Sequence, residues 1–569
     1  MIYGIIYRDK AKYEQWQPKI MINEVQEMFR ENVNHLQDSL FESTNWMNPR
    51  IKAKLDKSWA PIFYEHIFCK IDEKPFAVLY SDTGRPNFPV NIALSLEYIK
   101  HLKNYSDDEL IDNFYFNYLV NYAVGIRVLG DLNLAEKTLY DFRARVYRYL
   151  VQHPEQEDLI FASFLNLTKN FIKEAGISTE EQRMDSTMFM SNIKKAGRIA
   201  LAFDVLERAV KSVPKDLLTP NLKEVLKPEF KTDIIYRAKP SENESKLDIL
   251  VNLCLDVKNI IEKAPEIKDP DILRILTRFI SEQSIFDEQK NKLKAKDNKD
   301  IPTDSLQSAY DEDATYRKKG DKAQSGYVLT ITETCSKNNP FQMITDYKTD
   351  QNIKSDAEAG QGRISVIKEN TDCKHLYADG GYYSPDVIDK GKENEIELHF
   401  TNLNGKKPQK TLSVTQFEID ESTNIITKCP EGIAPIHTGI TKSQTVAHFA
   451  LNICDACKHR EDCYCKRQKK DYVVRINLKA IETARQRQKI EECRKENTSM
   501  RAAIEGTNSA LKRGHQLGKL KVRGFVKCNM VVGFKVLAHN FKRFANYMIE
   551  QSKKLKPQST GISLPILSQ

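Results

Sequence analysis

Several features are scarce or missing in this sequence of 569 residues, and each absence excludes a class of protein. No apolar run approaches the ~20 residues that a membrane-spanning helix needs. The start, MIYGIIYRDKAKYEQW, meets charged residues too early for the apolar stretch of a secretory signal. Glycine and proline number only 22 and 21, which excludes collagen-like and low-complexity chains. We therefore expect a soluble cytoplasmic protein, divided into several units because single cores seldom exceed ~250–300 residues.

Cysteine is also sparse, with 11 residues, an odd number in a chain that we expect to be intracellular. A disulfide framework is not expected in such a compartment, so a local cysteine cluster is first interpreted as a metal site. Four thiolates suit tetrahedral structural Zn²⁺, and reduced thiols without metal are the alternative. The candidate ligands are Cys429, Cys454, Cys457 and Cys463, with Cys465 and His459 as rivals for the fourth position.

Charge of one sign is not in large excess, because 87 Lys and Arg face 78 Asp and Glu for a net charge of +9. The surplus is uneven along the chain. From Lys466 to Gln569 there are 24 basic and 7 acidic residues, a net +17, and the remaining residues carry −8. A basic region on a slightly acidic body favours a polyanion such as nucleic acid as the partner, with a solvated basic helix as the alternative.

Changes in the apolar pattern divide the chain into helical and strand-like regions, typical of a mixed α/β protein with several domains. No internal repeat is present. The predicted organisation is a lead-in over 1–80, a helical domain over 81–150, strands of a core over 181–195 and 301–401, a helical insertion over 196–300, a strand-rich cysteine cluster over 402–470, a helical basic region over 471–552 and a tail over 553–569.

The region 81–150 predicts a bundle of helices. Ser106 is followed three residues later by Glu109, the signature of a capping box at a helix start. A further helix is expected over 138–150, and Arg143, Arg145 and Arg148 on it would be exposed. Such a bundle is either a DNA-reading domain or a purely structural one.

Alternation of polar and apolar residues predicts strands in the second half of the chain. They are expected over 326–335, 341–349, 373–379 and 395–401. The segment 182–193 is too short and too rich in Met and Thr for its periodicity to decide its structure. The lysine-rich QKNKLKAKDNKD (289–300) is interpreted as a solvated linker.

Three acidic residues stand out by their context. Asp185 lies in RMDSTMF, Asp379 ends an apolar strand before two glycines, and Glu505 lies on a predicted helix. Asp379 is thus placed where an α/β sheet presents catalytic groups, at its carboxyl edge. Arg501 and Lys512 share the helix face of Glu505, a stripe suited to a metal ligand between two phosphate contacts. Taken singly, each acid is more often a surface charge or a helix cap.

Together the three acids suit the cleavage of phosphodiesters. The attacking and leaving oxygens of an in-line displacement both develop charge, and two Mg²⁺ ions ~3.5–4 Å apart can stabilise both. Mg²⁺ binds a few carboxylates with water and substrate oxygens, so three acids from distant segments are sufficient. We therefore expect Mg²⁺, or Mn²⁺, to be held by Asp185, Asp379 and Glu505.

Several segments resemble the DDE transposases of bacterial insertion sequences, specifically the IS1182 group within the wider IS4/IS5-like set. MDSTMFMSNIKK and YADGGYYSPD look like the two aspartate motifs of that family, and RAAIEGTNSALKRG looks like its glutamate helix. Other similar segments are WAPIFYEHIFCKIDEKPF, GRPNFPVNIALSLEYIKHLKNYSDDELIDNFYFNYLVNYAVGI, DEDATYRKKGDKAQSGYVLTITET and KVRGFVKCNMVVGFKVLAHNFKR.

The resemblance implies a catalytic domain with an RNase H-like fold and a catalytic triad of Asp185, Asp379 and Glu505. Asp185 would lie on the first strand of that fold and Asp379 just after the fourth. The helical region 81–150 would bind double-stranded DNA at the terminal inverted repeats of the element. A homodimer that brings two ends together is expected from the same resemblance.

Basic residues near Glu505 are expected to contact DNA phosphates, with a solvated face as the alternative. In the related YREK signature Arg501, Glu505 and Lys512 match, whereas Thr498 stands where the family has tyrosine. The expected DNA contacts are Arg501, Lys512, Arg513, Lys519, Lys521 and Arg523.

The sequence thus predicts a DNA transposase that cleaves the phosphodiester at each element end and joins the freed 3′-OH to target DNA. We expect it in the cytoplasm, associated with the nucleoid. One alternative is a catalytically inactive or domesticated DNA-binding protein derived from a transposase. Another is a zinc-stabilised regulator that uses the charged helices over 196–300 to bind a partner.

Overall fold

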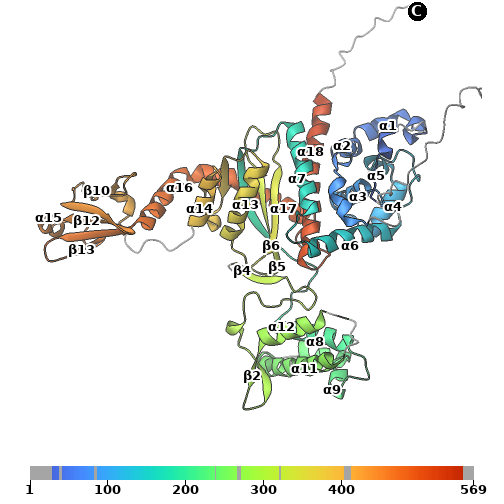
Figure 1. Ribbon diagram of the computed structural model, residues 1–569, viewed down its shortest axis with the longest axis horizontal. Helices are drawn as coiled ribbons and strands as arrows, with labels where there is room; N and C mark the ends of the chain where they lie inside the picture. Colours follow the sequence, from blue (N-terminus) through green and yellow to red (C-terminus); the bar gives the residue numbers. More distant parts are fainter. Residues whose placement is uncertain are drawn as a thin grey trace, which may run out of the picture. The chain divides into compact units, whose positions relative to one another are not determined.

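A computed structural model describes residues 29–37, 41–81, 86–237, 239–264, 269, 271–319, 322–402 and 412–554 (Figure 1). Contacts divide the chain into two compact units, Met1–Lys100 with Tyr105–Leu159, and His101–Asn104 with Ile160–Gln569. The start of the predicted lead-in and nearly all of the predicted tail lie outside the described residues. None of the helices in the described ranges is long and apolar enough to span a membrane.

The first unit is built from helices. They are α1 (Pro49–Asp56), α2 (Trp59–His66), α3 (Val90–Lys103), α4 (Asp107–Phe116), α5 (Tyr118–Ala123) and α6 (Glu136–Gln152), with short 3-10 turns at Asn34–Leu36, Ser43–Trp46, Phe68–Lys70 and Lys74–Leu79. The predicted capping box is confirmed at the start of α4. Glu109 N donates to Ser106 Oγ at 3.1 Å, and Ser106 N donates to the Glu109 carboxylate at 2.7 Å.

The prediction of exposed arginines on α6 is wrong for Arg143. Its guanidinium lies 2.6 Å from the carboxylates of Glu97 on α3 and Asp107 on α4, and its side chain is only 21% exposed. An arginine held by two carboxylates in this way joins three helices of the unit, and its charge is already compensated.

The second unit contains a six-stranded mixed sheet. Its strands are β1 (Glu181–Phe189), β4 (Thr315–Lys319), β5 (Lys322–Thr334), β6 (Ile344–Gln351), β7 (His375–Ala378) and β8 (Glu397–Phe400). The order is β4-β5-β1-β7-β8, and β6 also pairs with β5. β5 runs antiparallel to β1 and to β6, whereas β7 is parallel to both β1 and β8. The predicted strands are confirmed, and the undecided segment 182–193 forms most of central β1.

Helices cover both faces of this sheet (Figure 1). On one face, Met184 of β1 and Leu376 of β7 pack with Ile364 of α13 (Asp356–Asn370), and α14 (Pro385–Glu393) lies alongside. On the other face, the ring of Tyr347 on β6 contacts that of Phe164 on α7 (Leu159–Ala175), with centroids 4.9 Å apart. These apolar layers bury the centre of the sheet and leave only its edges and strand ends to solvent.

A helical insertion with its own hydrophobic core separates β1 from β4. It contains α8 (Arg198–Ser212), α9 (Pro220–Glu224), α10 (Pro228–Lys231), a π-helical turn (Thr232–Tyr236), α11 (Asn243–Lys263), α12 (Ile272–Gln283), β2 (Ser284–Asp287) and β3 (Lys292–Ala295). The prediction of a linker over 289–300 is therefore wrong in its first half. β3 pairs with β2 as a hairpin, and Asn252 of α11 both donates to and accepts from Leu293 of β3.

A second, strand-rich insertion follows β8 and also has its own core. Its elements are β9 (Glu418–Ile419), β10 (Ile426–Lys428), β11 (His437–Thr441), β12 (Gln444–Phe449), α15 (Leu451–Asp455), β13 (Cys465–Arg467) and β14 (Tyr472–Asn477). The chain then continues through α16 (Leu478–Ala502), α17 (Ile504–Gly514) and α18 (Phe525–Lys554).

Candidate active site

The structure brings the three predicted acids together. Asp185 lies on β1, Asp379 directly follows β7, and Glu505 lies in the first turn of α17. β1 and β7 are parallel, and Arg183 pairs with Tyr377, so two residues further on Asp185 and Asp379 lie level on neighbouring strands. The parallel register thus places both aspartates at one position of the sheet.

One guanidinium contacts all three carboxylates. Arg501 Nη2 lies 3.1 Å from Asp185 Oδ1 and 3.9 Å from Asp379 Oδ2, and Arg501 Nη1 lies 3.3 Å from Glu505 Oε1. Three negative groups therefore share one positive group. Such a cluster is electrostatically incomplete, because the carboxylates repel one another and one arginine compensates only one of them.

Asp185 is the most buried of the three acids. It belongs to a central strand covered on both faces, and its side chain is only 12% exposed. Desolvation raises the pKa of its carboxyl group, the nearby Asp379 adds to this, and Arg501 acts in the opposite direction. Ionisation of a carboxyl group in this environment costs free energy, and a bound metal cation would offset that cost.

Asp379 is positioned by a tight turn between β7 and a short 3-10 helix (Gly380–Tyr382). Its side chain caps that turn, because Gly381 N donates to Asp379 Oδ1 at 2.7 Å. Gly380 N in turn donates to Asn402 Oδ1 at 2.9 Å. A side chain at position 380 would meet this oxygen at 2.3 Å, so only glycine fits here. The predicted Gly-Gly turn is thus a close approach of two backbone segments.

Glu505 lies beyond a break that the sequence analysis missed. α16 ends at Ala502 and α17 begins at Ile504, with Ala503 between them. Arg501 and Glu505 therefore lie on two successive helices and not on one, but they keep the predicted contact across one turn, with Arg501 Nη1 3.3 Å from Glu505 Oε1. The break places the Glu505 carboxylate at the N-terminus of α17, where the helix dipole favours a negative charge. Its side chain is 67% exposed.

Asn508 is a further side chain of the site, and the sequence analysis gave it no role. Its Nδ2 donates to Asp185 Oδ2 at 3.0 Å. Its Oδ1 is buried and has no hydrogen-bond partner among the described residues. The feature of the sequence that could have identified Asn508 is its position one helical turn after Glu505, on the same face of the helix. A buried, unpaired acceptor beside a carboxylate suits a water molecule on a bound cation.

The donor set fits Mg²⁺ or Mn²⁺. It offers carboxylate oxygens from three segments together with the unpaired oxygen of Asn508, and hard divalent cations prefer oxygen ligands. The exposed Glu505 side chain and the half-buried Asp379 leave room for water and substrate oxygens. We infer from this chemistry that the residues present suit the predicted cation.

A second carboxylate cluster lies beside the site and was also missed. Glu333 on β5 is completely buried, and Arg183 on β1 donates to it at 3.2 Å. Arg543 on α18 also donates to it, and Thr507 on α17 donates at 2.8 Å. Arg183 and Thr507 are each two residues from a site acid, so this cluster joins the strand of Asp185 to the helix of Glu505.

The predicted DNA contacts have different environments. Lys519 and Lys521 are exposed on a segment joined to the end of β1, because Leu520 N donates to Met190 O and Asn192 N donates to Val522 O. Arg523 is exposed too, but its Nε donates to Asn192 O at 2.8 Å. Arg513 is exposed, Lys512 is half-buried and Arg501 binds the three acids.

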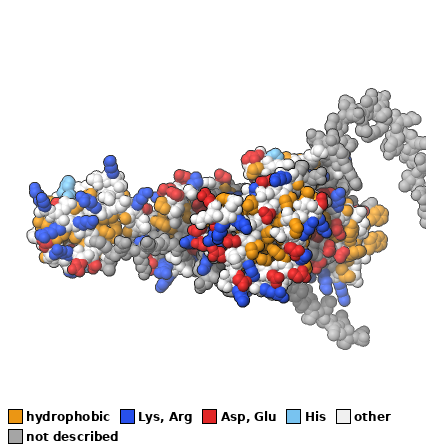
Figure 2. Space-filling model, turned by 90° about the horizontal axis from the view of Figure 1, so that it is seen from below, with side chains coloured by type: hydrophobic (Ala, Val, Ile, Leu, Met, Phe, Trp, Pro, Cys, Tyr) orange, Lys and Arg blue, Asp and Glu red, His pale blue; other side chains and the backbone are white. Residues whose placement is uncertain are grey.

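Several cations of the basic C-terminal region have internal partners. Lys535 is buried and donates to His515 O at 2.6 Å, Arg543 belongs to the Glu333 cluster, and Lys489 pairs with Glu397. On the face drawn in Figure 2, Lys and Arg side chains alternate with Asp and Glu. The net charge of +17 thus overstates the positive potential near the site, because several of its cations have internal partners.

The predicted cysteine ligands line one small cavity of about 30 Å³ in the strand-rich insertion. Its lining includes Cys429, Cys454, Cys457, Cys463, Cys465 and His459. Burial raises the pKa of Cys454 and Cys463 to about 11. A bound metal would reverse this effect, because a coordinating thiol loses its proton. The donor set fits Zn²⁺, and His459 also lies 3.1 Å from the Glu431 carboxylate.

Comparison with protein families identifies two segments. Residues 428–545 match the family described as transposase DDE domain, and residues 51–145 match the family described as transposase domain (DUF772). Both matches are to transposase families, in agreement with the resemblance of the sequence to insertion-sequence DDE transposases. The first match contains Glu505 and the five cysteines of the cavity, and the second contains most of the helical first unit. No curated protein and no solved structure matches the chain.

Proposed function

We propose that this transposase cleaves the phosphodiester at the ends of its element and transfers the freed 3′-OH to target DNA, with Asp185, Asp379 and Glu505 as catalytic residues. The observation that carries the proposal is the convergence of these three acids on one guanidinium. In the first reaction water attacks phosphorus and the 3′ oxygen leaves. In the second that 3′-OH attacks a target phosphodiester in line and displaces the target strand's own oxygen.

The three carboxylates would hold two Mg²⁺ or Mn²⁺ ions, which would supply stabilisation of the charge on the attacking and leaving oxygens. Asp185 is fixed by the sheet and by the Asn508 amide. Asp379 is fixed by its turn, and the exposed Glu505 can adjust to the substrate. Arg501 would exchange its contacts with the acids for a DNA phosphate once cations compensate them.

The strand order supports an RNase H-like core for the catalytic domain. Three antiparallel strands, β6, β5 and β1, are followed by β7 and β8 parallel to β1. If β4 is left out, these strands follow one another along the chain as β1, β5, β6, β7 and β8. The first of them carries Asp185, and Asp379 directly follows the fourth. This is the arrangement that the resemblance of the sequence implies, and both aspartates lie at its centre.

We further propose that the helical first unit binds the terminal inverted repeats and that the cysteine cavity holds a structural Zn²⁺. The transposase-domain match at 51–145 supports the first assignment. Five thiols and an imidazole line one cavity, which supports the second assignment. A homodimer on DNA would then join two element ends. Membership of the IS1182 group fits the same match.

The test is a cleavage assay on DNA that carries the short inverted repeats flanking the reading frame. Asp379→Asn and Glu505→Gln should each lower cleavage at least about 100-fold, the scale of losing one electrostatic partner of the transition state. Asp386→Asn, an exposed aspartate in the first turn of α14, is the matched control and should keep full activity. Full cleavage by either site variant would exclude the mechanism and favour a role in DNA binding alone.

A further inference from the structure

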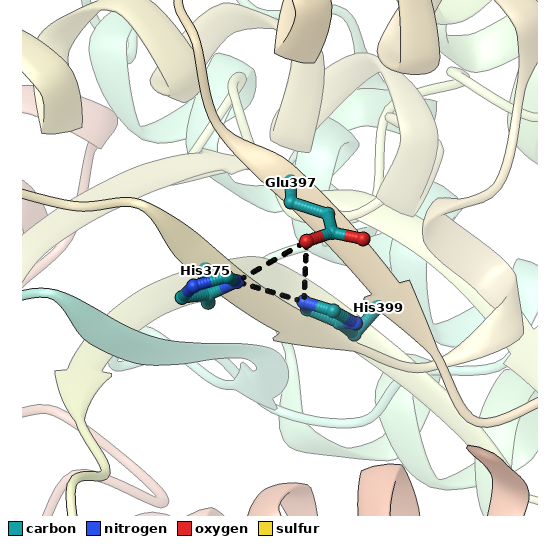
Figure 3. A group of neighbouring side chains, drawn as sticks. All are labelled: His375, Glu397 and His399. Atoms are coloured by element: carbon teal, nitrogen blue, oxygen red, sulfur yellow. Dashed lines mark hydrogen bonds and ion pairs between the residues drawn. The ribbon is translucent and has the colours of Figure 1, made fainter.

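A group of three potential metal ligands lies at the edge of the sheet, away from the proposed active site (Figure 3). His375 Nδ1 is 3.1 Å from His399 Nε2, and Glu397 Oε2 is 3.5 Å from the first nitrogen and 3.9 Å from the second. Figure 3 shows the two ring nitrogens and one carboxylate oxygen pointing toward a common centre.

The register of β7 and β8 produces this group. His375 pairs directly with Glu397, and Tyr377 pairs with His399, so all four side chains lie on one face of two parallel strands. The ring of Tyr377 stacks on that of His399 with centroids 4.6 Å apart, which fixes the imidazole plane. His375 is four residues before Asp379, a separation of roughly 13 Å along a strand. The group is therefore distinct from the three acids.

The two oxygens of Glu397 have separate partners. Oε1 accepts from Lys489 Nζ on α16 at 2.6 Å, whereas Oε2 faces the two imidazole nitrogens. Lys489 thus orients the carboxylate without occupying the oxygen that the histidines share. Outer partners that hold a ligand in this way are typical of metal sites in proteins.

The charges of the group also suit a cation. Two imidazole nitrogens 3.1 Å apart share at most one proton if both rings are neutral, and the carboxylate adds a negative charge. Burial lowers the pKa of the His399 imidazole, which favours the neutral ring that binds metal. The His375 and Glu397 side chains are 41% and 45% exposed, so solvent reaches the centre of the group.

We propose that His375, Glu397 and His399 form a site for a divalent transition-metal ion of the Zn²⁺ class. Two imidazoles and one carboxylate with an open position are a ligand set for Zn²⁺ and related ions, whereas Mg²⁺ prefers oxygen ligands. The ion would tie the edge strand β8 to β7, the strand that leads to Asp379. Asn402 lies two residues after the end of β8, and its Oδ1 accepts a hydrogen bond from Gly380 N in the turn that follows Asp379. This inference does not depend on the proposed catalytic mechanism.

The test measures zinc bound to the full-length, tag-free protein after dialysis against zinc-free buffer. His399→Gln and His375→Gln should each lose one zinc equivalent per chain relative to the unaltered protein. His153→Gln is the matched control, because His153 also lies beside a glutamate, Glu155 at 3.7 Å, without a second histidine. It should lose none. His375 is the more exposed ligand, so its variant keeps the test valid if His399→Gln does not fold.

Cobalt substitution separates this site from the cysteine cavity. Co²⁺ bound by nitrogen and oxygen gives visible bands without the near-ultraviolet charge-transfer bands of Co²⁺ bound by thiolate. Cys457→Ser should keep the histidine-dependent visible bands, and His399→Gln should lose them. Equal zinc content and equal cobalt spectra for the unaltered protein and both histidine variants would overturn the proposal and leave a hydrogen-bonded group without metal. The readout is metal content, so a failure of the proposed catalytic function would not affect it.

Discussion

Two clusters of carboxylates and arginines adjoin one another in the second unit, and their charges are balanced differently. In one, Glu333 is fully buried between the guanidinium groups of Arg183 and Arg543. In the other, Asp185, Asp379 and Glu505 share the guanidinium of Arg501. The first has an excess of one positive charge, and the second has an excess of two negative charges.

The difference indicates that the Glu333 cluster stabilises the fold, whereas the cluster of three acids is suited to bind a ligand. Each oxygen of Glu333 accepts at least two hydrogen bonds, so this cluster needs no further partner. The three acids share one cation, and an oxygen of Asn508 beside them is buried without a partner among the described residues. A fold retains such an imbalance at a cost in stability where a ligand offsets it. We therefore expect opposite responses when single carboxylates are removed from the two clusters.

The largest effect on stability is expected from Glu333→Gln. The change leaves the buried guanidinium of Arg183 and the partly exposed one of Arg543 without their anion, and breaking a buried ion pair from one side costs about 3–5 kcal/mol of unfolding free energy. Denaturant unfolding of the full chain measures this loss. Glu505→Gln, which removes an exposed acid from the unbalanced cluster, should cost less than about 1 kcal/mol.

A matched control for this comparison is Glu491→Gln. Glu491 pairs with Arg494 on the surface of α16, and both side chains are more than half exposed. Its loss should change the unfolding free energy by less than about 1 kcal/mol. The comparison breaks down if Glu333→Gln is as stable as this control, because Glu333 would then contribute nothing as an anion.

Divalent cations should stabilise the unbalanced cluster by a somewhat smaller amount. A ligand that binds only the folded state adds about 2.7 kcal/mol at 100 times its dissociation constant. Thermal unfolding of the unaltered protein should therefore shift upward as Mg²⁺ or Mn²⁺ is added. Asp379→Asn should lose most of the shift, and Asp386→Asn should keep it. An equal shift in Asp379→Asn would mean that the cations bind elsewhere.

Asp185→Asn should stabilise the protein in the presence of a chelator, by about 1 kcal/mol at neutral pH, because it removes one poorly compensated buried charge. Burial raises the Asp185 pKa above its ordinary value of 3.8. The folded state therefore binds this proton more tightly than the unfolded state does, and stability falls as pH rises between the two pKa values. The variant has no such loss, so its advantage should be largest above the raised pKa.

Unfolding of both proteins at a series of pH values checks this prediction. The advantage of Asp185→Asn should shrink as the pH falls toward 3.8, where the unaltered side chain becomes protonated in both states. A variant that is less stable than the unaltered protein at neutral pH would show that Arg501 and Asn508 already compensate the Asp185 charge. Cleavage should be lost in the same variant, so stability and activity would change in opposite directions.

The proximity of the three acids could be predicted from the sequence only through their joint context, because the motifs together resemble those of a known family. The Gly-Gly turn marks Asp379, and the alternating strand before Cys335 is present as β5. The contact of Arg501 with Glu505 could be predicted from their spacing on the chain, whereas its contacts with Asp185 and Asp379 could not, because those acids lie on distant segments. Glu333 could not be predicted either, since its partners are 150, 174 and 210 residues away.

The hairpin of β2 and β3 illustrates a different limit. The sequence of β3 is KLKA, and a lysine-rich segment of this kind is as typical of a solvated linker as of an exposed hairpin. Only its pairing with β2 and the contact of Leu293 with Asn252 decide between them. Tertiary contacts of this kind determine the structure where local propensity is weak.

The smallest effect, on the salt dependence of DNA binding, is expected from the exposed cations Lys521 and Arg523. They differ as the two clusters do, because Arg523 has internal partners that compensate part of its charge. Each protein cation that neutralises a phosphate contributes about 0.9 to the slope of log affinity against log salt concentration. Lys521→Ala should therefore lower that slope by about 0.9 on DNA carrying the element ends. Arg523 already donates to the Asn192 carbonyl and lies over the Tyr310 ring, so Arg523→Gln should change the slope less. The reverse order, measured by titrations at several salt concentrations, would show that Arg523 leaves its internal partners to bind DNA.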